Sequence, residues 1–391
     1  MRRVYLDNNA TTPLLPEVKQ EVIEFLDIYG NASSLHKFGK ESRLRIEKVR
    51  EKISEYIGAK KNEIYFTSGA SEANNLVLKG VSSCGKTCCP GKESNPHIIT
   101  TVVEHPSVLN TCKCLEGLGV EVTYLKVDSD GRISLEELEK SIKTNTSLIS
   151  VMFANNEIGT IQPIREIGLI AKKHNIKFHT DAVQVFAKEN INVDDLNIDF
   201  LTFSGHKFNA LKGVGGLYIR SKNHVCPLIH GGHQEGMLRA GTENTIGIIS
   251  MGKALEYYME HPETEDKILK MRNDLENYIL QNISDTKLNG HKEYRLKNTV
   301  NISFRFIEGE SILLMLDHLG IAVSTGSACS SDSLEPSHVL KEIGLDDDMA
   351  HSSVRISLGP LTTQEEIDYV KNNIKNVIDR LRSLSPLYNE A

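Results

Sequence analysis

Short apolar runs alternate with helical patterns through the first half of the chain. Between the runs, segments such as Ser71–Val81, Ser107–Leu118 and Pro163–His174 repeat their apolar residues about every 3.6 positions, which is typical of helices. Strand–helix alternation of this kind predicts an α/β fold with a mainly parallel sheet covered by helices on both faces. The seven predicted strands are Glu63–Thr67, His97–Val102, Glu121–Leu125, Leu148–Phe153, Lys177–Thr180, Phe200–Phe203 and Gly216–Ile219.

The pattern changes in the C-terminal third. The order of elements there predicts a smaller α+β domain, which we expect the extreme N-terminus to complete. We therefore predict a large domain at residues 15–257 and a small domain formed by residues 1–14 and 258–391. The elements expected in the small domain are a helix at Lys267–Gln281, a strand at Asn298–Phe304, a helix at Glu310–Leu319, a strand at Ser353–Leu358 and a helix at Thr363–Arg382.

Composition excludes several classes of protein. The 391 residues are 39% hydrophobic and 25% charged, which is close to globular averages, and the net charge is −7. A negative chain offers no broad basic face to nucleic acid or to anionic lipid. No apolar run approaches the roughly 18 residues of a membrane span, and the N-terminus has no signal-peptide pattern. We therefore expect a soluble cytoplasmic protein with no nucleic-acid or membrane partner.

An acid and a lysine each follow an apolar run of strand length. Asp181 and Lys207 are expected to lie together, because the carboxyl ends of neighbouring parallel strands meet at the edge where open α/β sheets bind ligands. A lysine that forms a Schiff base and an acid that keeps a pyridine nitrogen protonated are what pyridoxal 5'-phosphate (PLP) requires. Gln184, Ser204 and His206 supply further hydrogen-bonding groups beside them.

Two more segments end strands at the same predicted edge. Thr67-Ser-Gly-Ala-Ser71 opens a helix, so its free N–H groups and hydroxyls favour a phosphate, although such turns also serve simply as helix caps. His105, in Glu104-His-Pro106, is placed where it could stack on a pyridine ring and exchange protons near neutral pH. The alternative for His105 is that it only caps the helix that follows.

A cysteine occurs in an unusual setting near the C-terminus. Cys329 lies in the segment Ser324–Ser333, which contains no large side chain and therefore cannot bury apolar surface. We predict a mobile loop, and a thiol on such a loop suits a nucleophile that must reach two places.

These residues lead to a family. Over essentially its whole length the chain resembles the cysteine desulfurases of the NifS/IscS type, which are fold-type I PLP enzymes of the class V aminotransferase family. The matching segments are Tyr5-Leu-Asp-Asn-Asn-Ala-Thr-Thr-Pro13, Phe66-Thr-Ser-Gly-Ala70, Val103-Glu-His-Pro106, Ala154-Asn-Asn-Glu157, Asp181-Ala-Val-Gln184, Ser204-Gly-His-Lys207, His230-Gly-Gly-His-Gln-Glu235, Arg239-Ala-Gly-Thr242, Gly326-Ser-Ala-Cys329 and Leu334-Glu-Pro336.

The resemblance implies a role for each matching residue. It assigns Lys207 to the Schiff base with PLP, Asp181 to the pyridine nitrogen, Gln184 to the ring hydroxyl and His105 to the ring face. Asn156 and Arg355 match positions that hold the substrate carboxylate, and the planar fork of Arg355 suits that task. The phosphate site falls on Ala70, Ser71, Ser204 and His206, with Thr242 donated by the other subunit of a homodimer.

The implied reaction converts L-cysteine into L-alanine. Lys207 removes the Cα proton, His105 manages the proton of the substrate thiol, and Cys329 attacks the sulfur and keeps it as a persulfide. The persulfide then goes to an acceptor protein such as an iron–sulfur scaffold. Whether the sulfur serves iron–sulfur clusters, tRNA thiolation or nitrogenase maturation is left open by the sequence.

This chain departs from the family pattern at a few places. Asn209-Ala-Leu211 replaces an aromatic or histidine followed by Gly-Pro, directly after the lysine, and could alter the loop beside PLP. The segment Ser82–Asn95 is longer than in relatives, and we expect an exposed, dispensable loop there.

Two other interpretations stay open. A selenocysteine lyase or an aminotransferase would use the same fold and cofactor, but an aminotransferase has no use for Cys329. A metal-binding or scaffold protein could instead be built around the clustered cysteines, although adjacent cysteines rarely bind one zinc ion. Those cysteines are Cys84, Cys88, Cys89, Cys112 and Cys114.

Overall fold

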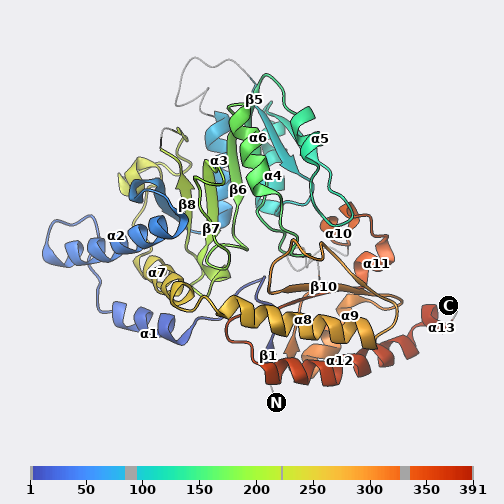
Figure 1. Cartoon of the computed structure of the whole chain (residues 1–391). Coiled ribbons are helices and arrows are strands. Elements are labelled where there is room, and N and C mark those ends of the chain that lie inside the picture. The colour runs from blue at the N-terminus through green and yellow to red at the C-terminus, as the bar shows by residue number, and fades with distance from the viewer. Residues whose placement is uncertain (1–2, 84–94, 222, 326–334, 390–391) are drawn as a thin grey trace.

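The structure is a computed structural model, and it describes residues 3–83, 95–221, 223–325 and 335–389. Its centre is a seven-stranded sheet in the order β2-β8-β7-β6-β5-β3-β4 (Figure 1). Every neighbouring pair is parallel except the two that involve β8, so the prediction of a mainly parallel seven-stranded sheet is confirmed. The strands are β2 (Ile64–Thr67), β3 (His97–Thr101), β4 (Glu121–Leu125), β5 (Thr146–Ser150), β6 (Lys177–Asp181), β7 (Phe200–Ser204) and β8 (Gly215–Ile219).

Alternate residues of these strands point to opposite faces, and each face packs against its own helices. Ile98 and Leu148 belong to the hydrophobic cluster that includes α3 (Ala70–Ser83) and α4 (Pro106–Glu116). Their neighbours Ile99 and Ile149 belong to the cluster on the other face. The helices of that second face are α2 (Lys37–Ile57), α6 (Ile164–Lys173) and α7 (Thr245–Glu260), with α1 (Pro16–Phe25) and α5 (Leu135–Lys140) beside them.

A second sheet lies below the first in Figure 1. It is antiparallel, in the order β12-β10-β9, and it packs against α8, α9 and α12 through a separate hydrophobic cluster. Val4 pairs with Ile321, and Asp7 bridges to Ser357, so the N-terminal segment joins this part of the molecule. The bounds are α8 (Thr264–Asn282), β9 (Thr286–Leu288), β10 (Thr299–Phe304), α9 (Gly309–His318), β12 (Ser353–Ser357) and α12 (Gln364–Leu384).

Short elements complete the second part. β1 (Val4–Tyr5) and β11 (Ile321–Ala322) form a two-stranded parallel sheet. The predicted boundary after residue 257 falls inside α7, and the division into domains stays a prediction. The remaining helices are α10 (His338–Glu342), α11 (Asp347–His351), α13 (Pro386–Asn389) and the 3-10 turns η1 (Lys61–Glu63), η3 (Gly205–Lys207) and η4 (Gln234–Met237).

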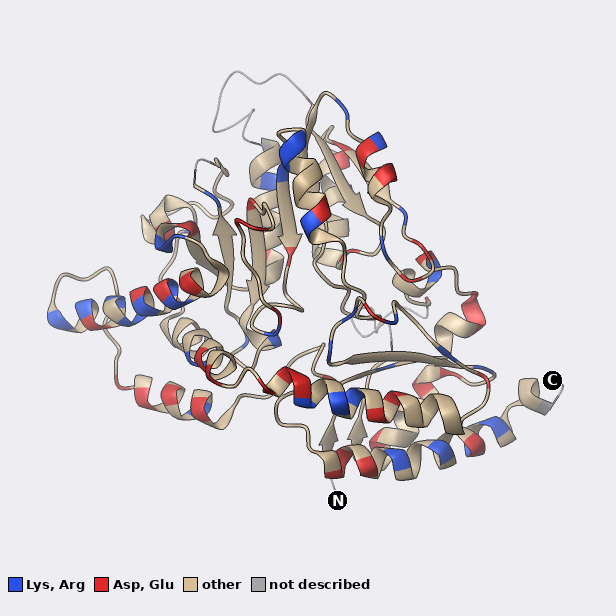
Figure 2. Ribbon diagram, viewed as in Figure 1, with Lys and Arg blue, Asp and Glu red and all other residues tan. Residues whose placement is uncertain are grey.

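Charged residues of both signs are interspersed along α2, α8 and α12 (Figure 2). The long terminal helix α12 begins at a capping box, in which the Thr363 hydroxyl accepts from the Glu366 N–H and the Glu366 carboxylate accepts from the Thr363 N–H. No helix within the described ranges is both long and apolar enough to cross a membrane.

Candidate active site

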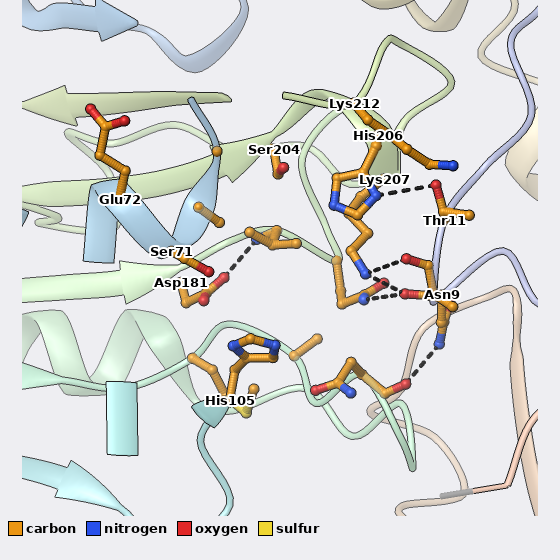
Figure 3. Close-up of a pocket in the computed structure, with 18 of the residues that line it drawn as sticks. Asn9, Thr11, Ser71, Glu72, His105, Asp181, Ser204, His206, Lys207 and Lys212 are labelled. Atoms are coloured by element: carbon orange, nitrogen blue, oxygen red, sulfur yellow. Dashed lines mark hydrogen bonds between the residues drawn. The ribbon is translucent and has the colours of Figure 1, made fainter. Parts of the chain in front are cut away.

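A cleft of about 610 Å³ opens at the carboxyl ends of the parallel strands, between the two sheets (Figure 3). The sequence reasoning placed the ligand site at this edge. Of the twelve predicted site residues, the ten that line the cleft are Ala70, Ser71, His105, Asn156, Asp181, Gln184, Ser204, His206, Lys207 and Arg355. The other two are Thr242 and Cys329.

Lys207 ends the 3-10 turn that follows β7, and the N-terminal segment holds this turn. The Lys207 amine donates to the carbonyls of Asn9 at 2.7 Å and Ala10 at 2.8 Å (Figure 3). The Thr12 hydroxyl and N–H both donate to the carbonyl of His206, at 3.0 and 2.9 Å. Lys207 therefore lines the cleft on a turn that the N-terminal segment holds at two successive residues.

Asp181, the last residue of β6, is buried and well supplied with donors. Its Oδ1 accepts from the Val183 N–H at 3.0 Å, and its Oδ2 accepts from the Asn74 side chain at 2.7 Å. The site therefore presents a carboxylate in the same cleft as the lysine amine.

The start of α3 forms the third element of the cleft. β2 ends at Thr67, and the turn Ser68–Gly69 leads directly into the helix, whose first N–H groups face the cleft. Gly215 on β8 permits this turn, because a Cβ on Gly215 would lie 2.7 Å from the Cα of Gly69. The close approach leaves a concave backbone surface suited to an anion.

His206 also lines the cleft, and its Nδ1 is 3.2 Å from the Thr11 hydroxyl. Burial, together with the charges of Lys207 and Lys212, lowers the pKa of His206 to about 4. His206 is therefore a neutral hydrogen-bonding group at physiological pH.

His105 both caps a helix and lines the cleft, so the predicted cap is confirmed, whereas its role at a pyridine ring stays a prediction. It is the N-cap of α4, and its Nδ1 accepts from the Ser107 N–H at 3.1 Å. Burial lowers the pKa of His105; the charge of Asp181 opposes this shift, whereas Lys207 and His338 add to it. The ring is therefore neutral at physiological pH.

Arg355, on β12, forms the opposite wall. Its Nη2 donates to Asp7 Oδ1 at 2.8 Å, and its Nη1 donates to the carbonyl of Asn156 at 3.1 Å. Its Nε is buried and has no hydrogen-bond partner among the described residues, and the same holds for the Oε1 of Gln184. Two buried polar atoms that lack partners at one cleft indicate a site that a polar ligand completes.

Asn209, the departure from the family pattern, adopts a left-handed backbone with φ 65°. Its N–H donates to the Thr12 hydroxyl at 2.7 Å, and its side chain donates to the carbonyl of Pro13 at 2.7 Å. Its Oδ1 accepts from the Tyr258 hydroxyl at 2.6 Å. Asparagine is among the few residues that tolerate this conformation, so the substitution fits a turn that ties Lys207 to the N-terminal segment.

Thr242 and Cys329 are placed differently from the other ten. Thr242 is exposed and lines a smaller neighbouring pocket together with Ser68 and Gly213, so it does not reach the cleft of its own chain. Its contribution to a partner subunit stays a prediction. Cys329 lies outside the described residues, as do Cys84, Cys88 and Cys89 of the predicted insert.

Sequence reasoning missed three residues that shape the site. Asn9 contributes a backbone carbonyl, for which no side-chain signal exists. Asp7 lies in the matching segment that ends at Pro13, but nothing in that segment indicates its ion pair with Arg355. Asn74 occupies a buried position on the apolar face of α3, and a polar residue at such a position is the signal that could have identified it.

The residues of the cleft fit PLP. The lysine amine matches the aldehyde of that cofactor, and the hydrogen-bonded carboxylate matches its pyridine nitrogen. The helix N-terminus suits the phosphate, and the unpartnered amide oxygen suits the ring hydroxyl. No cluster of His, Cys, Asp or Glu suited to a metal ion occurs in the part of the chain that the structure describes.

Comparison with known proteins agrees with the geometry. The fold and the site define a member of the family described as Aminotransferase class-V, whose model matches residues 4–370. The chain is 50% identical over 391 residues to the cysteine desulfurase IscS of Dictyoglomus turgidum, covering 100% of this chain and 98% of that protein. It is 48% identical over 388 residues to the cysteine desulfurase IscS of Methanosarcina thermophila, covering 99% and 94%.

A solved structure of a NifS-like protein superposes with a TM-score of 0.90 at 40% identity, covering 97% of this chain and 100% of that one. A second solved structure, SspA in complex with cysteine, gives a TM-score of 0.79 at 38% identity, covering 92% and 100%. The chain therefore belongs to the class-V aminotransferases and, within them, to the cysteine desulfurases of the NifS/IscS type.

Proposed function

We propose that this protein is a PLP-dependent cysteine desulfurase that converts L-cysteine into L-alanine and collects the sulfur as a persulfide on Cys329. The observation that carries the proposal is the meeting of Lys207, Asp181 and Arg355 in one cleft of a chain that belongs to this family. The relative SspA, whose solved structure contains cysteine, supports the choice of substrate.

The cofactor would be held by residues that already line the cleft. We assign Lys207 to the covalent link, Asp181 to the ring nitrogen and Gln184 to the ring hydroxyl. Bound there, PLP supplies an electron sink for the electrons released at Cα. We assign the phosphate to Ala70, Ser71, Ser204 and His206, with Thr242 of a second subunit completing it in a homodimer.

The substrate carboxylate would bind at Arg355. Its guanidinium is oriented by Asp7, and its Nε is the donor that lacks a partner within the described residues. A planar fork oriented in this way binds a carboxylate in a defined orientation, and Asn156 lies beside it. The carboxylate thereby fixes which bonds of the amino acid face Lys207.

Two groups of the chain handle protons. The Lys207 amine takes the Cα proton, and the carbonyls of Asn9 and Ala10 hold the resulting ammonium. His105, whose Nδ1 is occupied by the cap of α4, holds a proton on Nε2 and offers this N–H to the substrate sulfur. Both side chains already line the cleft, on segments that follow strands of the seven-stranded sheet.

The described residues on either side of the segment that carries Cys329 contact residues of the proposed substrate site or their neighbours. Ser324 and Arg355 exchange two backbone hydrogen bonds, of 3.1 and 2.7 Å. Ser337 donates to the Glu157 carboxylate, next to Asn156. In the reaction the Cβ–S bond of cysteine breaks and an S–S bond to Cys329 forms. The thiol protons of the two cysteines remain, one on the persulfide and one on the alanine produced.

The sulfur would then pass to an acceptor protein such as an iron–sulfur scaffold. The relatives bear the name IscS, and this is the basis for placing the protein in iron–sulfur cluster assembly. The persulfide is the form in which the sulfur would leave the subunit.

Sulfur transfer to Cys329 can be separated from other reactions of the fold. Incubation with L-cysteine should yield alanine and a persulfide on the peptide that contains Cys329. Cys329→Ser should bind PLP and cysteine normally yet form almost no alanine, whereas Cys114→Ser, which changes an exposed cysteine of α4, should be unaffected. Full alanine formation in Cys329→Ser would point to a lyase that needs no thiol.

A further inference from the structure

A buried asparagine on α3 connects two of the proposed site residues. Asn74 is fully buried, and its amide nitrogen donates to Asp181 Oδ2 at 2.7 Å and to the Ser107 hydroxyl at 2.9 Å. The Ser107 hydroxyl lies 2.8 Å from His105 Nδ1. Four side chains therefore form one continuous row of hydrogen bonds from the carboxylate to the imidazole.

The chemistry of the groups gives this row a single direction. A carboxylate accepts hydrogen bonds, so the amide of Asn74 must turn its NH₂ group toward Asp181. The second hydrogen of that NH₂ then points to Ser107, whose oxygen accepts it. The Ser107 O–H is left to donate, and the acceptor within reach is His105 Nδ1.

The backbone reinforces the same direction. The Ser107 N–H also donates to His105 Nδ1, at 3.1 Å. A ring nitrogen that accepts two hydrogen bonds carries no proton, so the proton of the neutral ring lies on Nε2, which lines the cleft.

We propose that Asn74 and Ser107 are positioning residues that keep His105 neutral, with its proton on Nε2, and that the Asp181 carboxylate sets this tautomer through them. With the proton on Nε2, His105 presents a hydrogen-bond donor to a substrate sulfur. The inference rests on the proposed function in this respect, because that function supplies the sulfur. Bonds from its NH₂ group to two site elements offset part of the cost of burying the Asn74 amide, whose Oδ1 has no hydrogen-bond partner among the described residues.

The direction of the effect on titration follows from the geometry. Donors at Nδ1 stabilise the neutral ring, so removing one raises the affinity of His105 for a proton. The other charged and titratable groups that face this ring are Asp181 on β6, Lys207 on the turn after β7 and His338 on α10. None of these three is altered by a substitution at Ser107.

The test is nitrogen NMR of the protein labelled with ¹⁵N-histidine, with the His105 signals assigned by their loss in His105→Asn. In the unaltered protein, Nδ1 should show the shift of an unprotonated ring nitrogen and Nε2 that of a protonated one. Ser107→Ala should raise the proton affinity of the ring about three- to tenfold, the worth of one neutral hydrogen bond. Ser107→Thr, which keeps the hydroxyl, should restore the original value.

Thr111→Val is the matched control. Thr111 is on the same helix, and its hydroxyl donates to the backbone carbonyl of Ser107 and not to the ring. This variant should leave the His105 titration unchanged. Asn74→Ala should shift the titration in the same direction as Ser107→Ala, and the combined variant should shift it by less than the sum, because both changes interrupt one row.

Three outcomes would overturn the proposal. They are a proton on Nδ1 in the unaltered protein, an unchanged titration in Ser107→Ala, and an equal shift in Thr111→Val. If Ser107→Ala failed to fold, the Asn74→Ala titration and the Nδ1 shift of the unaltered protein would still decide. None of these readouts requires turnover, so the row of hydrogen bonds and the desulfurase activity are tested separately. A protein without desulfurase activity could still have the row, and an active protein could lack it.

Discussion

The two walls of the cleft differ in the group that would complete each of them. On the wall built on the seven-stranded sheet, both oxygens of Asp181 and the amine of Lys207 already have partners. On the wall built on the three-stranded sheet, Arg355 has a buried nitrogen without a partner in the described part of the chain. Gln184 on the first wall also has a buried oxygen without a partner in that part of the chain. Under the proposed function, the cofactor would complete the first wall and the substrate would complete the second.

The largest effect should come from the wall built on the seven-stranded sheet. Lys207→Ala removes the proposed base, and alanine formation should fall on the order of 10²–10⁴-fold, the usual worth of a positioned acid or base. PLP should still bind, without a covalent link. Lys212→Ala removes an equal charge from the same cleft and should cost far less. Near-normal turnover in Lys207→Ala would show that Lys207 is not the base.

The other wall should respond in KM. Arg355→Lys keeps the positive charge but loses the fork, so the KM for cysteine should rise by roughly 10- to 100-fold, as expected for hydrogen bonds to a charged group. The affinity for PLP should stay the same, because Arg355 is assigned to the substrate and not to the cofactor. If PLP binding weakened and KM did not change, the assignment of the two walls would be reversed.

Glu104, which is buried behind the wall built on the seven-stranded sheet, should make the free energy of unfolding depend on pH. Burial raises the pKa of Glu104 to about 8, with the charge of Asp181 adding to the shift. A group whose pKa is raised in the folded state stabilises fully below its unfolded pKa, and that stability is lost as pH rises toward the folded pKa. The contribution of Glu104 should therefore decline between about pH 4.5 and pH 8.

Glu104→Gln should remove that decline, which amounts to a few kcal/mol. The amide oxygen of the introduced glutamine would keep an acceptor for the Thr101 hydroxyl and the Met152 N–H. Urea unfolding at several pH values measures the effect, with Glu41→Gln, an exposed change on α2, as the control. A variant whose unfolding free energy follows the unaltered protein at every pH would show that Glu104 is ionised in the fold.

The smallest effect concerns the turn behind Lys207. Tyr258→Phe removes the hydroxyl that donates to Asn209 and should lower the unfolding free energy by about 1 kcal/mol. Asn209→Ala should cost more than Asn209→Gly, because only glycine accepts the positive φ without strain. Thermal unfolding measures all three, and equal losses for Ala and Gly at position 209 would exclude backbone strain.

Much of the fold could be predicted from the sequence, because buried positions recur with different periods in strands and in helices. The helix expected at Ser107–Leu118 is α4, and the strand expected at Glu121–Leu125 is β4. The strand expected at Leu148–Phe153 instead pairs over Thr146–Ser150. Its apolar run continues into Val151–Phe153, which is buried, and the N–H groups of Val151 and Phe153 still donate to the β6 carbonyls of His179 and Asp181 beyond the end of β5.

The site was predicted unevenly for a physical reason. Lys207, Asp181 and Arg355 act through side chains whose chemistry is visible in the sequence. Asn9 acts through a carbonyl, and Asn74 acts through its position between two elements, which only the folded chain brings together. Cys329, predicted to be a mobile carrier, lies outside the described residues.

The most direct test of the central claim is to locate the covalent link to the cofactor. Reduction of the PLP-loaded protein with borohydride, followed by digestion and peptide mass analysis, identifies the lysine that carries it. We predict a single labelled lysine, Lys207, and loss of all label in Lys207→Ala. Label on Lys212, the other lysine of the cleft, or no label on a protein that still forms alanine, would contradict the account.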